Sequence, residues 1–246
     1  RQVCPMGHYC AEGTQHPLRC PAGTYNPYPG GENVTVSCRQ CDAGKYCEGT
    51  GLTRPTGPCF AGYFCPRGCE DRRCYSSVCS GNPGGDCPAG FYCPNGTATP
   101  IACPDGTMSS RPGAITCPEC PAGYYCPTGT TTPLRCPIGR YCPVGTGPTQ
   151  PECPPGTFSN LTHLVNATGC TFCDAAAACT TSGLTQPNAW CEAGYYCTFG
   201  AKTTRGWPGG LGGEGGHCPT GHYCPPRTAV PIKCPLGTYN PTTYTN

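Results

Sequence analysis

The apolar residues of this chain gather in short clusters around cysteines and do not form long continuous runs. No apolar run approaches the roughly 18 residues that a membrane-spanning helix requires. The segments between successive turn signals are too short for helices. The pattern therefore predicts paired strands of two or three residues. The alanine-rich segment Ala175–Ala178 is the one place where we expect a single helical turn.

One motif, C-x-x-G-x-aromatic-C, recurs along the chain and marks a repeat. Eight copies keep glycine at the fourth position: Cys4–Cys10, Cys41–Cys47, Cys59–Cys65, Cys87–Cys93, Cys120–Cys126, Cys136–Cys142, Cys191–Cys197 and Cys218–Cys224. The segment Cys173–Cys179 has the same spacing but lacks the glycine and the aromatic residue.

A second motif, C-P-x-G-T followed by tyrosine, methionine or phenylalanine, alternates irregularly with the first. It opens at Cys20, Cys103, Cys153 and Cys234. The first three copies run on to the cysteines Cys38, Cys117 and Cys170, each three positions before the next unit.

Both motifs contain the residues of a tight turn. Proline after the cysteine fixes φ, and glycine two positions later supplies a positive φ. The aromatic residue before the second cysteine can lie over a disulfide and supply a minimal core. Each motif therefore predicts a small hairpin.

Composition places these hairpins in an oxidising compartment. The chain has 28 cysteines among 246 residues, together with 37 glycines, 32 prolines, six phenylalanines and two tryptophans. So few large apolar side chains cannot offset the entropy of ordering the chain, and disulfides must do so. Zinc sites are the alternative, but the cysteine and histidine spacing does not suit them. We therefore expect an extracellular protein, secreted or on the cell surface.

The two motifs together resemble a known repeat. The phrase formed by Cys103, Pro104, Gly106, Thr107, Cys117, Cys120, Pro121, Gly123, Tyr125 and Cys126 resembles the ephrin-receptor-like cysteine-rich repeat, which is itself similar to tumour-necrosis-factor-receptor modules. The resemblance covers most of the chain. Long arrays of this type resemble parts of large surface proteins, including ciliary-hair (mastigoneme) proteins. The resemblance identifies no ligand.

The resemblance, together with the position of each loop before C-x-x-C, implies that the long loops close on themselves. The implied pairs are Cys20–Cys38, Cys103–Cys117 and Cys153–Cys170. For the other cysteines many pairings are open. An alternating pattern, Cys41–Cys59 with Cys47–Cys65, is one of them.

These observations predict a small disulfide-rich fold: an elongated tandem array of cysteine-rich modules with short β-hairpins and almost no helix. Six divisions follow from the motifs: repeats 1–40, 41–86 (with the insertion Cys69–Cys79), 87–119 and 120–172, a degenerate repeat 173–217 with the glycine-rich loop Gly206–Gly216, and an incomplete repeat 218–246. The insertion adds an odd number of cysteines, and local pairing is favoured there over an intermolecular bridge.

Four N-x-[ST] sequons lie in loops between cysteines: Asn33, Asn95, Asn160 and Asn166. Accessible sequons in a secreted protein are usual acceptors of N-linked glycans. We therefore expect a glycoprotein.

Other chemistry has little support in the sequence. The net charge is +2 and 11% of residues are charged, so no basic stripe favours nucleic acid. No acidic cluster suggests a calcium site. No nucleophile system or paired acids indicate catalysis. We expect no enzyme activity, cofactor, catalytic residue or resident metal.

Two functions remain at this stage. The first is a structural glycoprotein that builds an extracellular fibre, coat or ciliary hair, with other copies of the chain or other extracellular structural proteins as partners. The alternative is the ligand-binding or adhesion ectodomain of a receptor. Cys234 opens a loop whose closing cysteine is expected 14 to 18 positions later, beyond Asn246, so we expect the chain to be an excerpt of a longer repeat protein.

Overall fold

Short antiparallel hairpins make up the fold. The computed structural model describes residues 2–75, 84–206 and 215–241, which hold twenty strands of two residues each. In chain order they are β1 (His8–Tyr9), β2 (Leu18–Arg19), β3 (Thr24–Tyr25), β4 (Arg39–Gln40), β5 (Lys45–Tyr46), β6 (Gly57–Pro58), β7 (Tyr63–Phe64), β8 (Gly85–Asp86), β9 (Phe91–Tyr92), β10 (Ile101–Ala102), β11 (Tyr124–Tyr125), β12 (Leu134–Arg135), β13 (Thr157–Phe158), β14 (Thr171–Phe172), β15 (Ala177–Ala178), β16 (Ala189–Trp190), β17 (Tyr195–Tyr196), β18 (Gly216–His217), β19 (His222–Tyr223) and β20 (Ile232–Lys233).

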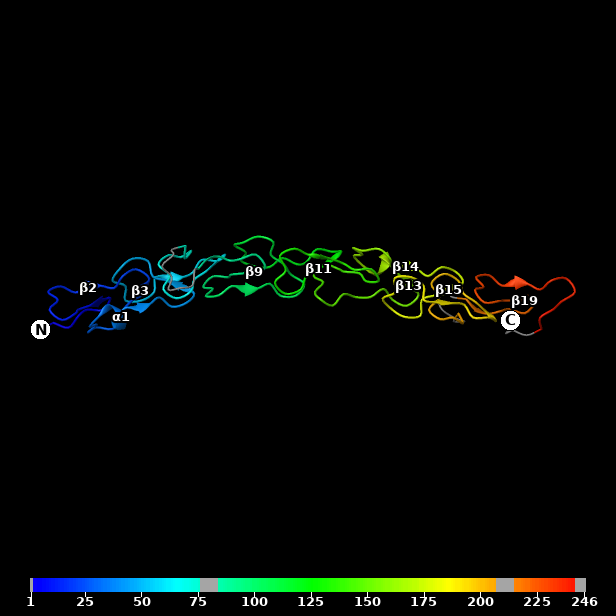
Figure 1. Cartoon of the computed structure of the whole chain (residues 1–246), viewed down its shortest axis with the longest axis horizontal. Coiled ribbons are helices and arrows are strands. Elements are labelled where there is room, and N and C mark those ends of the chain that lie inside the picture. The colour runs from blue at the N-terminus through cyan, green and yellow to red at the C-terminus, as the bar shows by residue number, and fades with distance from the viewer. Residues whose placement is uncertain (1, 76–83, 207–214, 242–246) are drawn as a thin grey trace. The chain divides into compact units, whose positions relative to one another are not determined.

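Each strand pairs with its neighbour in the chain, so β1 pairs with β2, β3 with β4, and so on to β19 with β20. These pairs are the short arrows of Figure 1. Two further hairpins hold only a single bridged pair, Thr107 with Glu119 and Arg140 with Glu152. The fold is therefore the small disulfide-rich hairpin fold that the motifs predict.

We call each hairpin a module, running from one opening cysteine to the residue before the next. Modules 1 to 12 open at Cys4, Cys20, Cys41, Cys59, Cys87, Cys103, Cys120, Cys136, Cys153, Cys173, Cys191 and Cys218. Each of the first five expected repeats contains two or three of these opening cysteines, and the incomplete repeat 218–246 contains one.

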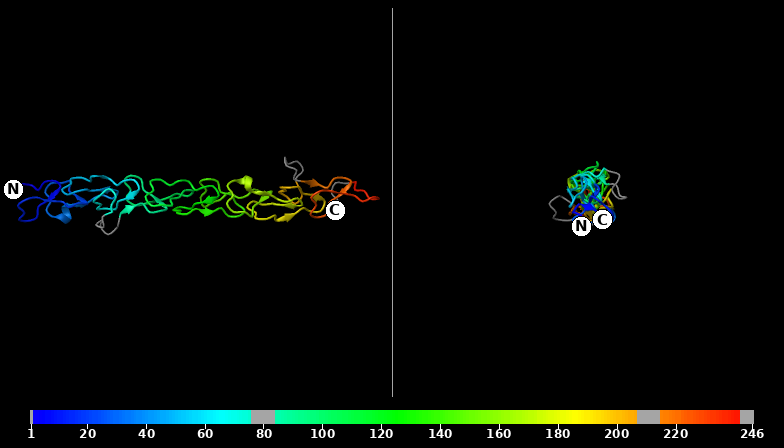
Figure 2. Two further views of the ribbon diagram at one scale, coloured as in Figure 1. Left: turned by 90° about the horizontal axis from the view of Figure 1, so that it is seen from above. Right: turned by 90° about the vertical axis from the view of Figure 1, so that its left-hand side faces the viewer.

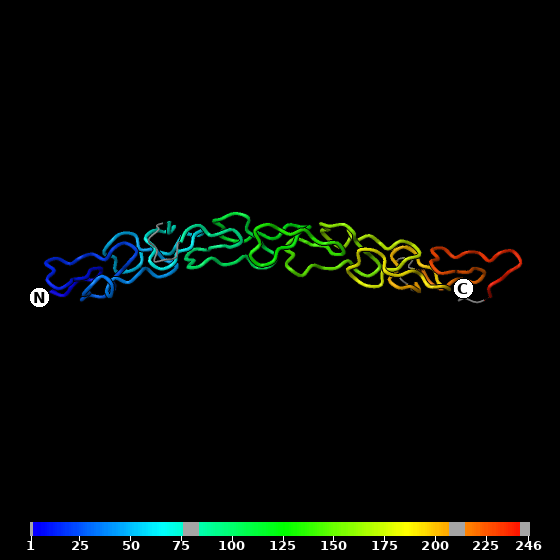
Figure 3. Tube along the Cα trace, viewed as in Figure 1, coloured from blue at the N-terminus to red at the C-terminus, as the bar shows by residue number. Residues whose placement is uncertain are grey.

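The chain divides into two compact units. Residues 1–119 and 127–132 form the first, and residues 120–126 and 133–246 form the second. Within each unit the trace passes from module to module in chain order (Figure 3). Consecutive modules lie next to each other in Figure 1 and in the left view of Figure 2.

The turn of each module has the geometry that its glycine allows. Gly44, for example, has φ of 78°, and the N–H of Lys45 donates to the carbonyl of Asp42 at 3.0 Å. A positive φ at the third turn residue favours glycine, which has no Cβ. In module 10, Ala176 occupies this position with φ of 71°. That module therefore keeps the turn although it has lost the glycine.

Disulfides supply the buried material. Among the described residues, thirteen disulfides join 26 cysteines; nine of them link cysteines six positions apart within one module. Most of these cysteines are fully buried, and the only other apolar residues buried among the described ones are Ala177, Ala178 and Ala201. The core is thus a series of bridges rather than an apolar interior.

One of the open cysteine pairings and one expectation about local structure do not occur in the structure. Cys41 pairs with Cys47 and Cys59 with Cys65, so the alternating pattern does not occur. The tight turn between each such pair brings their Cα atoms to 5.8 and 6.0 Å, which suits a disulfide.

The second correction concerns helix. Ala177–Ala178 is strand β15, because Ala176 takes the turn conformation and directs the chain into a hairpin. The two short helices found among the described residues lie instead in long loops: α1 (Val34–Ser37) and the 3-10 turn Ala167–Gly169. The side chains of Asn33 and Asn166 cap them by accepting backbone N–H groups, which satisfies donors at a helix start.

Candidate functional site

The most regular feature of both units is the junction between consecutive modules. Four backbone hydrogen bonds join module 3 to module 4. The N–H of Gly44 donates to the carbonyl of Cys65 at 2.8 Å, and Cys47 donates to Cys69 at 2.9 Å. In the other direction, Cys59 donates to Gly44 at 2.8 Å and Gly68 donates to Cys41 at 2.9 Å. The junction therefore pairs backbone groups that would otherwise compete for water.

The last of these bonds recurs at every junction that lies within a unit. The donor stands nine or ten positions after an opening cysteine, and the acceptor is the opening cysteine of the previous module, at 2.7 to 3.1 Å. The pairs are Gly30–Cys4, Gly51–Cys20, Gly68–Cys41, Gly96–Cys59, Gly113–Cys87 and Gly129–Cys103 in the first unit, and Gly145–Cys120, His163–Cys136, Gly183–Cys153, Gly200–Cys173 and Arg227–Cys191 in the second.

Every donor in this series has a positive φ, including His163 at 68° and Arg227 at 66°. The side chains of those two residues have compensating contacts. The rings of His163 and Tyr124 contact edge to face, with their centres 5.0 Å apart. The guanidinium carbon of Arg227 lies 4.1 Å from the centre of the Trp190 ring. Sequence reasoning missed this position, although a glycine nine or ten residues after most opening cysteines was a readable signal.

Modules of the second motif differ from the others at one buried position. Their opening cysteines pair within the long loops, as Cys20–Cys38, Cys103–Cys117 and Cys153–Cys170, the same pairs that the resemblance implies. The place of the missing second cysteine, six positions after the opener, is taken by Asn26, Ser109 and Ser159, all at most 4% exposed.

These polar residues are satisfied by backbone partners. The Asn26 amide donates to the carbonyl of His8 at 3.0 Å, and its oxygen accepts the N–H of Tyr28 at 3.1 Å. Ser109 donates to the carbonyl of Arg111 at 3.0 Å. A hydrogen-bonded side chain thus replaces a disulfide at this position. Sequence reasoning did not single these residues out.

The four sequons lie at two kinds of place. All four asparagines are exposed. Asn33, Asn160 and Asn166 stand in the long loops of modules 2 and 9. Asn95 stands directly before Gly96, one of the junction glycines, so its sequon is part of a junction.

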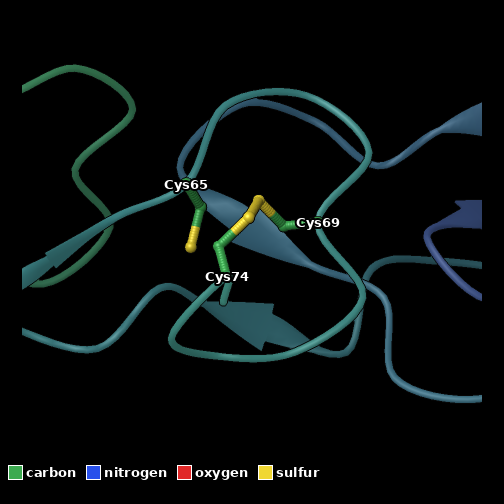
Figure 4. Close-up of side chains that lie close together, drawn as sticks. All are labelled: Cys65, Cys69 and Cys74. Carbon is green, nitrogen blue, oxygen red and sulfur yellow. A yellow bond between two sulfur atoms is a disulfide. The ribbon is translucent and has the colours of Figure 1, made fainter. Parts of the chain in front are cut away.

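The insertion in module 4 brings three cysteine sulfurs together. The Sγ atoms of Cys65, Cys69 and Cys74 lie within 4.8 Å of one another, and all three residues are buried (Figure 4). Cys65 is bonded to Cys59, and Cys69 to Cys74. Metal ions bind the thiolate, and a sulfur in a disulfide is not one. The oxidised cluster is therefore a pair of adjacent bridges. Cys79, the third cysteine of the insertion, lies outside the described residues, as does most of the glycine-rich loop.

Tyr63 packs against these bridges, and other arginine and aromatic side chains of module 4 contact one another. The guanidinium of Arg72 lies 4.8 Å from the centre of the Phe60 ring, and that of Arg73 lies 5.7 Å from Tyr63. The rings of Tyr75 and Tyr63 contact edge to face, with their centres 5.8 Å apart. The Tyr75 hydroxyl donates a hydrogen bond to the Asp86 carboxylate at 2.7 Å. That hydrogen bond raises the pKa of the Tyr75 phenol above its ordinary value.

Ion pairs elsewhere are exposed and local. In module 11 the Glu192 carboxylate accepts from the Thr204 hydroxyl at 2.6 Å and from Arg205 at 2.9 Å. These bonds lower the pKa of Glu192 below its ordinary value, the threonine bond most. Such exposed pairs add little stability.

One groove of the described surface has mainly apolar walls. The groove beside the loop of module 9, of about 410 Å³, is lined by Pro154, Thr157, Ala167, Thr168, Cys170 and Phe172. These residues include no ionisable side chain, because Cys170 is bonded to Cys153. No helix among the described residues is long and apolar enough to cross a membrane.

No protein-family model matches the chain, and no curated protein sequence matches it significantly. The resemblance to ephrin-receptor-like repeats therefore rests on the motifs alone. The density of disulfides is that of an extracellular cysteine-rich protein.

Proposed function

We propose that this chain is a glycosylated structural segment of an extracellular fibre, surface coat or ciliary hair. The observation that carries the proposal is the junction, because one set of backbone hydrogen bonds recurs between modules of differing sequence. Backbone bonding tolerates side-chain variation, so the same junction can be repeated many times. The motif resemblance to repeat arrays of extracellular surface proteins supports the same proposal.

The natural assembly tests this function. Antibodies against residues 1–246 should label an extracellular fibre, coat or ciliary hair in immuno-electron microscopy of the source cells. Matching labelling by antibodies against a known surface marker, without permeabilisation, serves as the control. Label confined to the cell interior would refute the proposal.

A receptor or adhesion ectodomain is the second candidate. The arginine and aromatic side chains of module 4 favour it, since such side chains are the usual hot spots of protein interfaces. They include the pair Arg72 and Phe60 and the pair Tyr63 and Tyr75. Diffuse label over the plasma membrane, with no fibre or coat, would favour this candidate over the structural one.

A further inference from the structure

The four sequons differ in the role of their threonine. In Asn33 and Asn166 the threonine hydroxyl donates to the carboxamide oxygen of the sequon asparagine, at 2.9 and 2.6 Å. Both threonines are exposed. The two groups that define the acceptor therefore lie together on the surface.

The third loop sequon is also open. Asn160 and Thr162 are exposed, and the Thr162 hydroxyl lies 3.2 Å from Nδ1 of His163, its neighbour in the chain. In none of the three loop sequons is the threonine hydroxyl enclosed by another module.

The threonine of the Asn95 sequon is much less accessible than those of the loop sequons. Thr97 is 7% exposed, and its hydroxyl donates to the carbonyl of Pro94 at 2.6 Å. Its own carbonyl accepts the N–H of Cys65 at 2.9 Å, and Gly96 donates to Cys59 at 2.8 Å. Both bonds tie the sequon to module 4.

A contact with module 3 closes it further. A Cβ built on Gly44 would stand 2.3 Å from the carbonyl oxygen of Gly96, which shows how closely the two modules approach here. An enzyme could reach the threonine hydroxyl and the backbone of this sequon only if the junction opened.

The threonine at this position has a structural role that other modules share. Thr130, Thr146 and Thr228 each follow a junction residue, and each donates its hydroxyl to the carbonyl three positions earlier at 2.6 Å. Gly96 and Thr97 are therefore part of the junction. Because Asn95 precedes them, these three residues also form a sequon.

We propose that folding divides the four sequons: Asn33, Asn160 and Asn166 accept N-linked glycans in the folded chain, whereas Asn95 accepts one only before its junction closes. In the transfer, Nδ2 of the asparagine forms a bond to the anomeric carbon of a lipid-pyrophosphate-linked oligosaccharide. The bond from that carbon to the pyrophosphate oxygen breaks, the pyrophosphate leaves with the electron pair, and the carboxamide loses one proton to a base of the transferring enzyme.

This inference rests on the proposed function in one respect, namely that the chain passes through a compartment that glycosylates proteins. To test it, the full chain is secreted from cultured eukaryotic cells, with or without a brief pulse of dithiothreitol during synthesis. Glycans are removed enzymatically in heavy-oxygen water, so that each former glycan site carries a mass tag. Peptide mass spectrometry then gives the occupancy of each sequon.

Without reductant, we expect Asn95 to be occupied several-fold less than Asn33 and Asn166. The pulse, which keeps the disulfides open, should raise the occupancy of Asn95 several-fold and leave the loop sequons unchanged. Equal occupancy of Asn95 and the loop sequons without reductant, or no response of Asn95 to the pulse, would overturn the inference. No glycan at any sequon in either arm would overturn the glycoprotein part of the proposed function as well.

Two disulfide variants, expressed without reductant, distinguish opening of this junction from general effects of dithiothreitol on the cell. Replacing Cys59 and Cys65 by serine opens module 4 and leaves the sequon intact, so Asn95 occupancy should rise. The matched control replaces Cys218 and Cys224, a bridge of the same span in module 12, and should leave Asn95 unchanged. If either variant is retained in the cell, occupancy is read from the intracellular chain.

Discussion

Individual side chains in this protein are selected mainly by backbone conformation. The turn position and the junction position of each module both have positive φ, and most of these positions hold glycine. Several turn glycines also face a carbonyl two modules further on. For Gly7, Gly23, Gly44, Gly90 and Gly139, an added Cβ would stand 2.2 to 2.6 Å from that oxygen. At these five positions both the conformation and the close approach therefore disfavour larger residues, whereas the turn of module 10 accepts Ala176.

Two glycines of module 3 allow the cost of the left-handed conformation to be measured apart from the cost of the close approach. Gly44 and Gly49 have φ of 78° and 90°, but an added Cβ at Gly49 meets nothing within 4 Å. Gly49→Ala should therefore cost only the left-handed conformation, about 1–2 kcal/mol. Gly44→Ala should cost clearly more, because the Gly96 carbonyl must also move.

Amide hydrogen exchange at Cys59 measures the difference, since its N–H donates to the Gly44 carbonyl. Exchange there should be faster in Gly44→Ala than in Gly49→Ala. The same exchange rate in both variants would show that the close approach is irrelevant.

The buried Asn26 supports a second prediction. Asn26→Ala leaves the part-buried His8 carbonyl and Tyr28 N–H without their partner, and each lost hydrogen bond costs about 1 kcal/mol. Modules 1 and 2 should then become sensitive to protease under oxidising conditions. Asn188→Ala is the control, because Asn188 is exposed and its bonds to Thr180 can be replaced by water. Equal resistance of the two variants would contradict the prediction.

Hairpins were the part of the structure most easily predicted from sequence. Glycine three positions after all but one of the opening cysteines, with proline directly after most of them, predicts a turn, so short paired strands follow directly. Connectivity was harder, because a spacing of six fits both a bridge within one module and an alternating pair. The choice depends on how tightly the turn closes, which is a property of the folded backbone.

Helix and junction show the other limit of sequence reasoning. Ala175–Ala178 has favourable helix propensity, but pairing with Ala189–Trp190 makes part of it a strand. The junction was missed because its partners are far apart in sequence. The replacement of a cysteine by Asn26, Ser109 or Ser159 becomes meaningful only once the modules are superimposed by their hydrogen bonds.

Peptide mapping tests the bridges of modules 3 and 4. Cleavage after Arg39 and Glu48 without reduction should release a fragment that holds Cys41 and Cys47 in one closed bridge. The fragment with Cys59 and Cys65 should separate from it. The reduced digest is the control. A mass equal to the two fragments joined would instead establish the alternating pattern.

Stability of the chain as a unit depends on oxidation. Among the described residues, the fully buried apolar side chains are nearly all cysteines, and the aromatic residues that pack on them are only partly buried. Hydrophobic burial therefore cannot balance the loss of chain entropy. Each bridge restricts the unfolded chain, by about 2 kcal/mol for the short spans and about 3 kcal/mol for the long loops. The bridges also hold the turns whose backbone groups form the junctions, so losing them removes both contributions.

Reduction should therefore unfold every module instead of loosening a few. We expect a strong reductant to abolish the circular dichroism of the native chain and to expose all modules to protease, including those without a long loop. Each module depends on its own disulfide to hold the turn and on its neighbour for the junction hydrogen bonds. No described module has an independent apolar core that would stabilise it without its disulfide. The oxidised chain, incubated identically without reductant, is the control. A reduced chain as resistant to protease as the oxidised one would mean that the junction hydrogen bonds hold the fold without disulfides.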